Sequence, residues 1–235
     1  RAQGTYTKLF REERERPCHI VVDQRAAMFF GAHERFKSVQ AAHAATALAW
    51  AALSGGDRIG GQVLSIHGHT DSRAKRSKQA VLRFIHDVHT ANQQLLQAIT
   101  NSQPESSIPL SEGLIECQRL IRPGTAVFIV SDFADFDESC AQALVNMAKH
   151  ADLTLLHVQD DFEENLPVQG RLAISDGQNQ ASLNFDSDLI SAYREQRADC
   201  IALLKSAVKR SRARYATLTT SEPVDRQLMQ IFTRA

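Results

Sequence analysis

The chain has 235 residues with 27 basic and 27 acidic side chains, so its formal net charge is zero before any histidine is protonated. Hydrophobic residues make up 43% of the sequence and charged residues 23%, which is typical of a globular protein and excludes disordered, collagen-like and coiled-coil chains. A general nucleic-acid binder would normally be basic. The longest apolar run, residues 44–53, is about half the length of a membrane span.

The predicted elements alternate between strands and helices. Strands are expected at residues 5–10, 18–22, 58–66, 125–130, 153–158 and 215–218. Helices are expected at residues 35–53, 77–100, 111–121, 137–150 and 187–208, and after Pro223. Strands separated by helices indicate a parallel sheet with right-handed crossovers. Two alternating runs around Asp176-Gly177 break this order and predict a β-hairpin over residues 170–185.

The first predicted helix has two distinct faces. Phe36, Val39, His43 and Trp50 follow a helical stripe, on which we expect His43 to be a hydrogen-bonded core residue. The other face consists mostly of alanine, so it can lie close against a sheet.

Two acids follow apolar strands and give the first indication of function. Asp23 ends the run 18–22, and Asp132 follows the run 125–130. Open α/β sheets bind ligands at the carboxyl ends of their strands, where the strand order reverses. The alternative is that each acid only caps the turn or helix that follows it.

Three segments resemble von Willebrand factor A domains. Residues 21–28 (Val-Val-Asp-Gln-Arg-Ala-Ala-Met) resemble the first metal motif of that fold, a hydrophobic strand followed by Asp-x-Ser-x-Ser. Residues 128–133 resemble the later strand whose acid completes the site, and residues 110–114 resemble the helix start after the metal-binding threonine. Nearly the whole chain is similar to one bacterial branch, domain-of-unknown-function family 58, in residues 8–13, 22–23, 36–50, 56–60 and 131–133 and in the late hairpin.

The resemblance implies an architecture and a role. It implies an α/β von Willebrand factor A-like fold with a mostly parallel sheet flanked by helices. Residues 1–235 would form a single domain, with 1–17 as an N-terminal edge strand and lead-in and 170–185 as a hairpin insertion. The family is associated with MoxR-type AAA+ ATPases, which implies a cytoplasmic adaptor or assembly factor that binds the ATPase and its client. The family's upstream Gly-Asp-Asp…Ile-Asp-Trp segment is absent, so we expect native residues before Arg1 that can carry a tether.

Departures from the metal motif decide the expected mechanism. Aligned on Asp23, the two serine positions hold Arg25 and Ala27, and the threonine position holds Ile108 beside Ser107; Asp132 remains. Mg²⁺ requires nearly ideal octahedral oxygen ligation, and an arginine side chain is always charged and can bridge carboxylates. We therefore expect no metal or other cofactor, and Arg25 paired with Asp23, Asp132 or both. Two alternatives stay open: Arg25 points to solvent, or a metal is retained.

The expected function is non-catalytic protein binding. The predicted binding rim consists of the loops after Asp23 and Asp132 and the loop before Ser111, with Gln24, Arg25, Ser107, Phe133 and Asp135. Phe133 and Phe136 are either exposed anchors, as aromatic residues often are at interfaces, or core residues, which we favour for at least one of them.

Two other functions are weighed against protein binding. One is a divalent-metal-dependent hydrolase or phosphotransferase that uses Asp23 and Asp132, with Lys8 or Lys37 completing a phosphoryl-accepting cluster. No nucleophile elbow or phosphate-binding loop supports an enzyme. The other is nucleic-acid binding through the basic runs at 73–78 and 205–214, for which solvated faces are the simpler explanation.

Overall fold

The computed structural model describes residues 15–32, 34–101, 108–164, 170–175, 180–185 and 187–233. The strands are β1 (Pro17–Gln24), β2 (Arg58–Ser65), β3 (Gly68–Lys75), β4 (Ala126–Ser131), β5 (Asp152–Gln159), β6 (Gly170–Ser175), β7 (Gln180–Phe185) and β8 (Arg214–Thr219). The helices are η1 (Ala26–Met28), α1 (Lys37–Ser54), α2 (Lys78–Thr100), α3 (Leu110–Leu120), α4 (Glu138–Met147), α5 (Asp161–Glu164), α6 (Ser187–Ser211) and α7 (Val224–Thr233). The strand expected at 5–10 lies outside the described residues.

The main sheet has the strand order β3-β2-β1-β4-β5-β8. All neighbouring strands are parallel except β3, which runs antiparallel to β2 at one edge. The order reverses between β1 and β4, because the chain builds the sheet outward from β1 in one direction and then from β4 in the other. The carboxyl ends of β1 and β4 therefore meet at the place where such sheets bind ligands.

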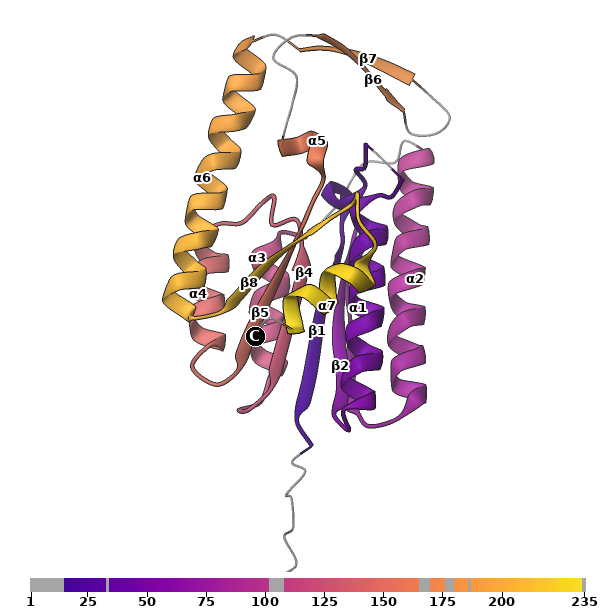
Figure 1. The fold of residues 1–235 in the computed structure, drawn as a ribbon, viewed down its shortest axis with the longest axis vertical. Helices are drawn as coiled ribbons and strands as arrows, with labels where there is room; N and C mark the ends of the chain where they lie inside the picture. The colour runs from indigo at the N-terminus through magenta and orange to yellow at the C-terminus, as the bar shows by residue number, and fades with distance from the viewer. Residues whose placement is uncertain are drawn as a thin grey trace, which may run out of the picture.

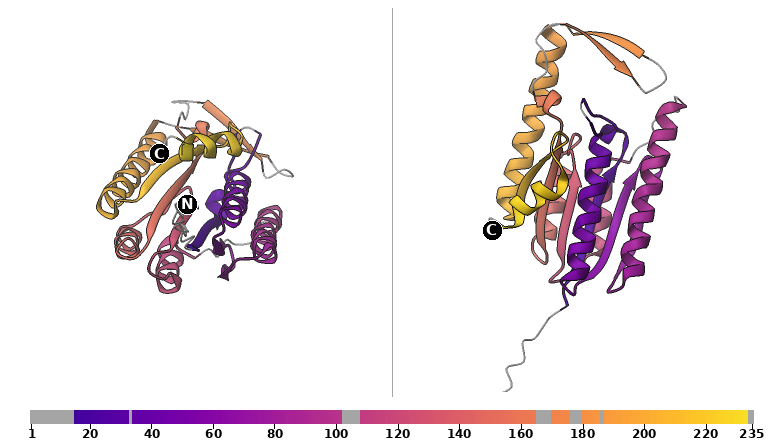
Figure 2. Two further views of the ribbon diagram at one scale, coloured as in Figure 1. Left: turned by 60° about the horizontal axis from the view of Figure 1, so that its bottom comes forward. Right: turned by 45° about the vertical axis from the view of Figure 1, so that its right-hand side comes forward.

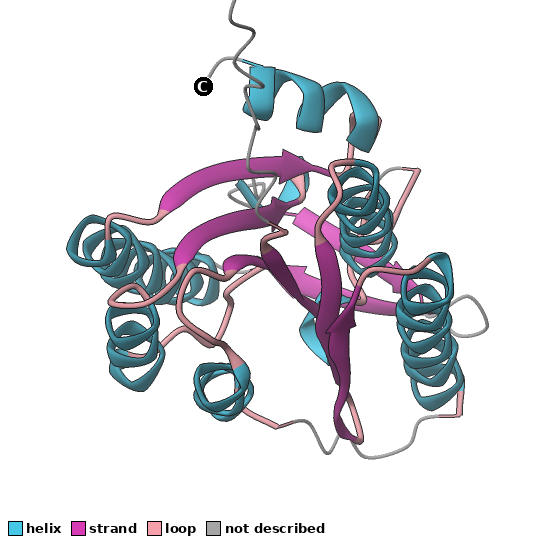
Figure 3. Ribbon diagram, turned by 90° about the horizontal axis from the view of Figure 1, so that it is seen from below, coloured by secondary structure: helices cyan, strands magenta, loops and turns pink. Residues whose placement is uncertain are grey.

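Helices cover both faces of this sheet (Figures 1 and 2). On one face α1, α2 and α7 pack over Ile20 and Val22 of β1, and on the other α3, α4 and α6 pack in the cluster that contains Val21. Figure 3, seen from below, shows the helices arranged around the twisted sheet. Strands covered on both faces have nearly continuous apolar sequences, which is why their positions were predictable. The predicted α/β fold is confirmed.

The edge strand β3 was not predicted. Its residues are mostly exposed and polar on both faces, so the sequence has no apolar alternation to mark it. Part of its charge, at Arg73 and Lys75, belongs to the basic run for which a solvated face was the simpler explanation. Charged side chains along an exposed edge oppose pairing with other strands.

Helix α1 packs through its face of small residues. Ala41, Ala44 and Ala45 are fully buried, and the absence of long side chains lets the helix lie close to β1. The expectation for His43 is wrong, because this packing leaves His43 exposed. The buried face also carries Lys37 in the first turn of the helix.

Helix α3 lies close to the sheet because of one glycine. A Cβ atom at Gly113 would lie 2.6 Å from Leu64 Cδ2 of β2, so a larger residue here would have to displace the buried Leu64 side chain. The contact places the first turn of α3, and Ile108 just before it, beside the carboxyl end of β1.

The predicted hairpin is present as the two-stranded antiparallel sheet β6-β7. Within the described residues it pairs with no strand of the main sheet. It lies beyond the carboxyl ends of the main strands, at the top of Figure 1, and the 25-residue helix α6 runs from it down the side of the domain. None of the described helices has the length and apolar composition needed to cross a membrane.

Candidate functional site

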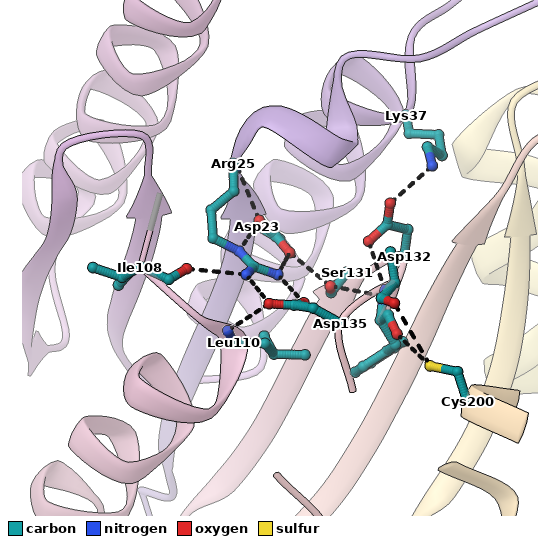
Figure 4. Close-up of polar contacts among 11 residues, drawn as sticks. Asp23, Arg25, Lys37, Ile108, Leu110, Ser131, Asp132, Asp135 and Cys200 are labelled. Atoms are coloured by element: carbon teal, nitrogen blue, oxygen red, sulfur yellow. Dashed lines mark hydrogen bonds and ion pairs between the residues drawn. The ribbon is translucent and has the colours of Figure 1, made fainter. Parts of the chain in front are cut away.

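Arg25 forms the centre of a buried ion cluster. Its Nε donates to Asp23 Oδ1 (3.0 Å) and its Nη2 to Asp23 Oδ2 (2.8 Å). On the other side Nη1 and Nη2 donate to the two oxygens of Asp135 (2.7 and 2.9 Å), and Nη1 also donates to the Ile108 carbonyl (3.1 Å). Figure 4 shows the guanidinium between the two carboxylates. A guanidinium has five N–H donors, and here all five are used.

The carboxylate of Asp23 is saturated with donors. Besides the two side-chain bonds from Arg25, Oδ1 accepts the Arg25 backbone N–H (2.9 Å) and Oδ2 accepts the Ser131 hydroxyl (2.7 Å). Four hydrogen bonds match the approximate acceptor capacity of a carboxylate. Asp23 is 1% exposed, so this charge is compensated entirely within the protein.

The electrostatic effect of the pairing is mutual. Burial disfavours the charge on Arg25, but Asp23 and Asp135 outweigh it and raise the arginine pKa. Burial would likewise raise the pKa of Asp135, but the hydrogen bonds and charge of Arg25 lower it below its ordinary value. Asp135 also accepts the Leu110 backbone N–H (2.9 Å) and so satisfies a free donor in the first turn of α3.

A second ion cluster lies next to the first. Lys37 Nζ donates to Asp132 Oδ2 (2.8 Å) and to Glu163 Oε1 (2.7 Å). The side chains of Lys37 and Asp132 are 3% and 1% exposed. Burial opposes the lysine charge, but the two carboxylates outweigh it and raise the pKa of Lys37. The cluster connects α1, the loop after β4 and α5.

The loop after β4 separates the two acids that sequence analysis expected together. Phe133 adopts a φ of 51°, in the left-handed region that costs a bulky residue about 1–2 kcal/mol. Its N–H donates to Ser131 Oγ (3.0 Å), and its carbonyl accepts the Cys200 thiol of α6 (3.1 Å). With the backbone held in this way, Asp132 turns to Lys37 and Asp135 turns to Arg25 (Figure 4).

The structure shows where most of the residues predicted for the degenerate metal site lie. Arg25 pairs with Asp23, as one form of the hypothesis had it, but not with Asp132, which Lys37 holds instead. Ile108 contributes its carbonyl oxygen, and Ala27 is exposed in η1. Ser107 lies outside the described residues.

Three residues of the predicted rim are buried and are corrected: Arg25, which is 4% exposed, Gln24 and Phe133. Gln24 is fully buried, where it donates to the Ser38 carbonyl and accepts from Asn92, so it joins α1 to α2. Phe133 is 1% exposed and Phe136 5%, and their rings pack edge to face. Both rings belong to the core beneath the loop, so neither is the exposed anchor that was considered.

Sequence reasoning missed three contributors. Ser131 was quoted only as part of the strand motif, although a hydroxyl next to the acid was a visible signal. Lys37 was considered beside Asp23 and Asp132 only for the phosphotransferase alternative, and its polar position on the alanine face of α1 was the available signal for a buried ion pair. Glu163 belonged to an acidic run interpreted as solvated, and only the fold brings it to Lys37.

The cluster does not fit a divalent ion. Asp23 has no acceptor capacity left, and Asp132 bonds to Lys37 and to the Ala134 N–H (3.1 Å). Among the described residues, no three His, Cys, Asp or Glu side chains form a group that could hold a metal. The two buried cations fix the loops after β1, before α3 and after β4, and they connect these loops to α1, α3 and α5.

A mostly parallel sheet with helices on both faces and a polar cluster at its strand-order reversal defines an α/β domain of doubly wound type. The family model described as protein of unknown function DUF58 matches residues 1–203, and the chain belongs to this family. Comparison with curated proteins gave no significant match.

The solved structures similar to this chain include von Willebrand factor A domains, the class predicted from the sequence. The VWA domain of SpRpn10 is 11% identical with a TM-score of 0.49, over 94% of this chain and 96% of that one. A von Willebrand factor type A protein from Catenulispora acidiphila is 14% identical with a TM-score of 0.43, over 80% and 43%. The pilus adhesin SpaC from Lactobacillus rhamnosus GG is 8% identical with a TM-score of 0.43, over 85% and 31%.

Proposed function

We propose that this chain is a non-catalytic protein-interaction domain in which a fixed arginine replaces the divalent ion of a metal-ion-dependent adhesion site. One observation carries the proposal: the five N–H groups of the Arg25 guanidinium donate to Asp23, Asp135 and the Ile108 carbonyl. A buried cation bonded in this way supports the surrounding loops without an exchangeable ligand. Asp135, whose side chain is 44% exposed, and the exposed Ala27 belong to the surface offered to a partner.

The proposed partner is a MoxR-type AAA+ ATPase, with the chain acting in the cytoplasm as an adaptor or assembly factor between the ATPase and its client. The support is the similarity to the DUF58 family. Partner recognition at the carboxyl edge of the sheet agrees with where open α/β sheets bind their ligands. The fold alone does not establish such a role, so binding has to be measured.

Added Mg²⁺ or Mn²⁺ should leave the thermal unfolding midpoint of the protein unchanged. A ligand that binds only the native state stabilises it by about 2.7 kcal/mol at 100 times its Kd, and Arg25 already holds the acceptors that an ion would need. Differential scanning fluorimetry with millimolar metal or with EDTA checks this. A rise that disappears in Asp132→Ala would contradict the proposal and favour the metal-dependent hydrolase or phosphotransferase.

The double variant Arg25→Ser, Ala27→Ser is the matched positive control for the metal experiment. It removes the guanidinium and restores both hydroxyl positions of the metal motif. We expect a metal-dependent rise of the midpoint in this variant only, because two oxygen ligands and the acceptors of Asp23 become available. The readout is the difference with and without metal, so the lower basal stability of the variant does not affect it.

A purified MoxR-type ATPase from the same organism should bind the chain with a Kd of about 10 μM or tighter. Binding of the nucleotide-free ATPase should be equal in Mg²⁺ and in EDTA, since the chain's cation is covalently attached. Biolayer interferometry with an unrelated AAA+ ATPase as control measures this. If the chain binds neither ATPase in any nucleotide state, the adaptor role is wrong.

A further inference from the structure

A pocket of about 220 Å³ lies beside the two ion clusters, between the loop after β4 and helix α6. Apolar groups of Phe133, Ile201 and Leu204 line it together with the polar side chains of Tyr193, Gln196 and Arg197. Ala134, an exposed residue of the loop, contributes to the lining as well. The pocket therefore combines apolar walls with a few polar groups at the edge of the sheet that faces the proposed partner.

The size of the pocket favours a single side chain over a free small molecule. Pockets for small ligands and cofactors measure about 300–1,000 Å³, which exceeds the volume here. In protein interfaces, by contrast, the residues that dominate affinity insert into small, well-packed pockets, and aromatic residues are prominent among them.

The charges around the pocket favour a neutral occupant. Asp132, which lines the pocket, is held by Lys37, and Arg197 lies 3.8 Å from Glu163. The carboxylate of Asp132 and the guanidinium of Arg197 are the acidic and basic side chains of the lining, and their formal charges cancel, so neither an acidic nor a basic side chain gains a net attraction from the lining. A guanidinium in the lining, here that of Arg197, prefers the face of an aromatic ring.

We propose that this pocket receives a neutral aromatic side chain of the protein partner and anchors it to the domain. The inference rests on the proposed interaction function and assigns the recognition chemistry of the same edge of the sheet. Tyrosine fits the lining, because its ring suits the apolar walls and its hydroxyl finds polar side chains at the pocket.

Cys200 provides a direct probe of occupancy. It lines the pocket and is partly exposed, whereas Cys18, Cys117 and Cys140 are buried. Burial raises the pKa of Cys200, so its alkylation by iodoacetamide is followed by mass spectrometry at mildly alkaline pH. N-acetyl-tyrosinamide at about 20 mM should slow this reaction about threefold, the factor 1 + [L]/Kd for a Kd of about 10 mM. N-acetyl-alaninamide should have no effect.

Two alanine-to-phenylalanine variants separate the pocket from the rest of the surface. Ala134→Phe places a ring at the pocket, and Ala202→Phe places the same ring on an exposed position of α6 outside the lining. Protection by N-acetyl-tyrosinamide should vanish in Ala134→Phe and persist in Ala202→Phe. Binding to the MoxR-type ATPase should weaken at least tenfold in the first variant only. Urea midpoints establish that both variants are folded.

The outcomes distinguish this inference from the proposed function. If N-acetyl-tyrosinamide gives no protection, or if both amides protect equally, the aromatic anchor is wrong even when the ATPase binds. Equal ATPase binding by Ala134→Phe and Ala202→Phe also overturns it and leaves the interaction function standing. Selective protection without any ATPase binding supports the pocket assignment and removes the ATPase as its partner.

Discussion

Replacing Arg25 with alanine should lower the free energy of unfolding by about 3–5 kcal/mol, the range for removing one partner of a buried ion pair. In the wild type Asp23 is 1% exposed and accepts four hydrogen bonds, two of them from the Arg25 side chain. The variant removes these two and leaves the buried carboxylate charged. It also deprives the Ile108 carbonyl of its donor. Urea denaturation followed by circular dichroism measures the loss.

The variant Arg25→Ala, Asp23→Asn is the matched control for this loss. Neutralising Asp23 removes the stranded charge, so the double variant should be more stable than Arg25→Ala alone. Arg25→Lys should fall between the wild type and alanine, because an ammonium has three donors and cannot form two forks. A loss below about 1 kcal/mol in Arg25→Ala, the level of an exposed ion pair, would mean that the cluster does not hold the loops.

Lys37→Met should cost a similar amount, about 3–5 kcal/mol, because it leaves the carboxylates of Asp132 and Glu163 without the lysine cation although their side chains are only 1% and 13% exposed. Methionine retains most of the length and apolar volume of the lysine stem, so the loss reports on charge and not on a cavity. Lys205→Met on the exposed surface of α6 is the control and should change stability by no more than about 0.5 kcal/mol.

The Lys37→Met variant should also have an altered pH dependence of stability. In the wild type the raised pKa of Lys37 means that its contribution is complete below the unfolded lysine pKa of about 10.4 and is lost only as pH rises through the higher folded value. The variant has no such group, so the stability difference between wild type and variant should be constant below about pH 10 and should shrink as the pH rises above the unfolded lysine pKa. Urea midpoints on both sides of this pKa measure the effect, and a difference that stays constant above it would contradict the prediction.

The sequence was sufficient to locate the candidate site but not to pair its charges. Asp23 and Asp132 could be placed at one edge because strand order follows from the alternation of strands and helices. Arg25 and Ala27 occupy the two serine positions of the metal motif, and this replacement pointed to a cation supplied by the chain itself. The choice of partner could not be predicted, because it depends on the left-handed backbone at Phe133, which turns Asp132 and Asp135 in different directions.

Two features of the fold could not be predicted from the spacing of apolar residues along the sequence. Strand β3 has too few buried positions to leave a pattern, so only its pairing with β2 identifies it. In α1 the alanine face packs against the sheet as predicted, but it also carries Lys37 into the interior, which the pattern of apolar residues did not indicate. The face of small side chains, and not the stripe of larger ones, is therefore the face of α1 that packs against the sheet.

The attachment of Arg25 to the polypeptide has a thermodynamic consequence. A site that recruits an ion from solution has an apo form, whose population follows the ion concentration of the compartment. Here the cation is synthesised with the chain at a fixed stoichiometry of one, and it keeps its proton at every physiological pH. Chelators and changes in ion concentration therefore have no effect on the equilibrium that shapes this edge, and in the proposed complex any control over the time of assembly has to come from the other molecule.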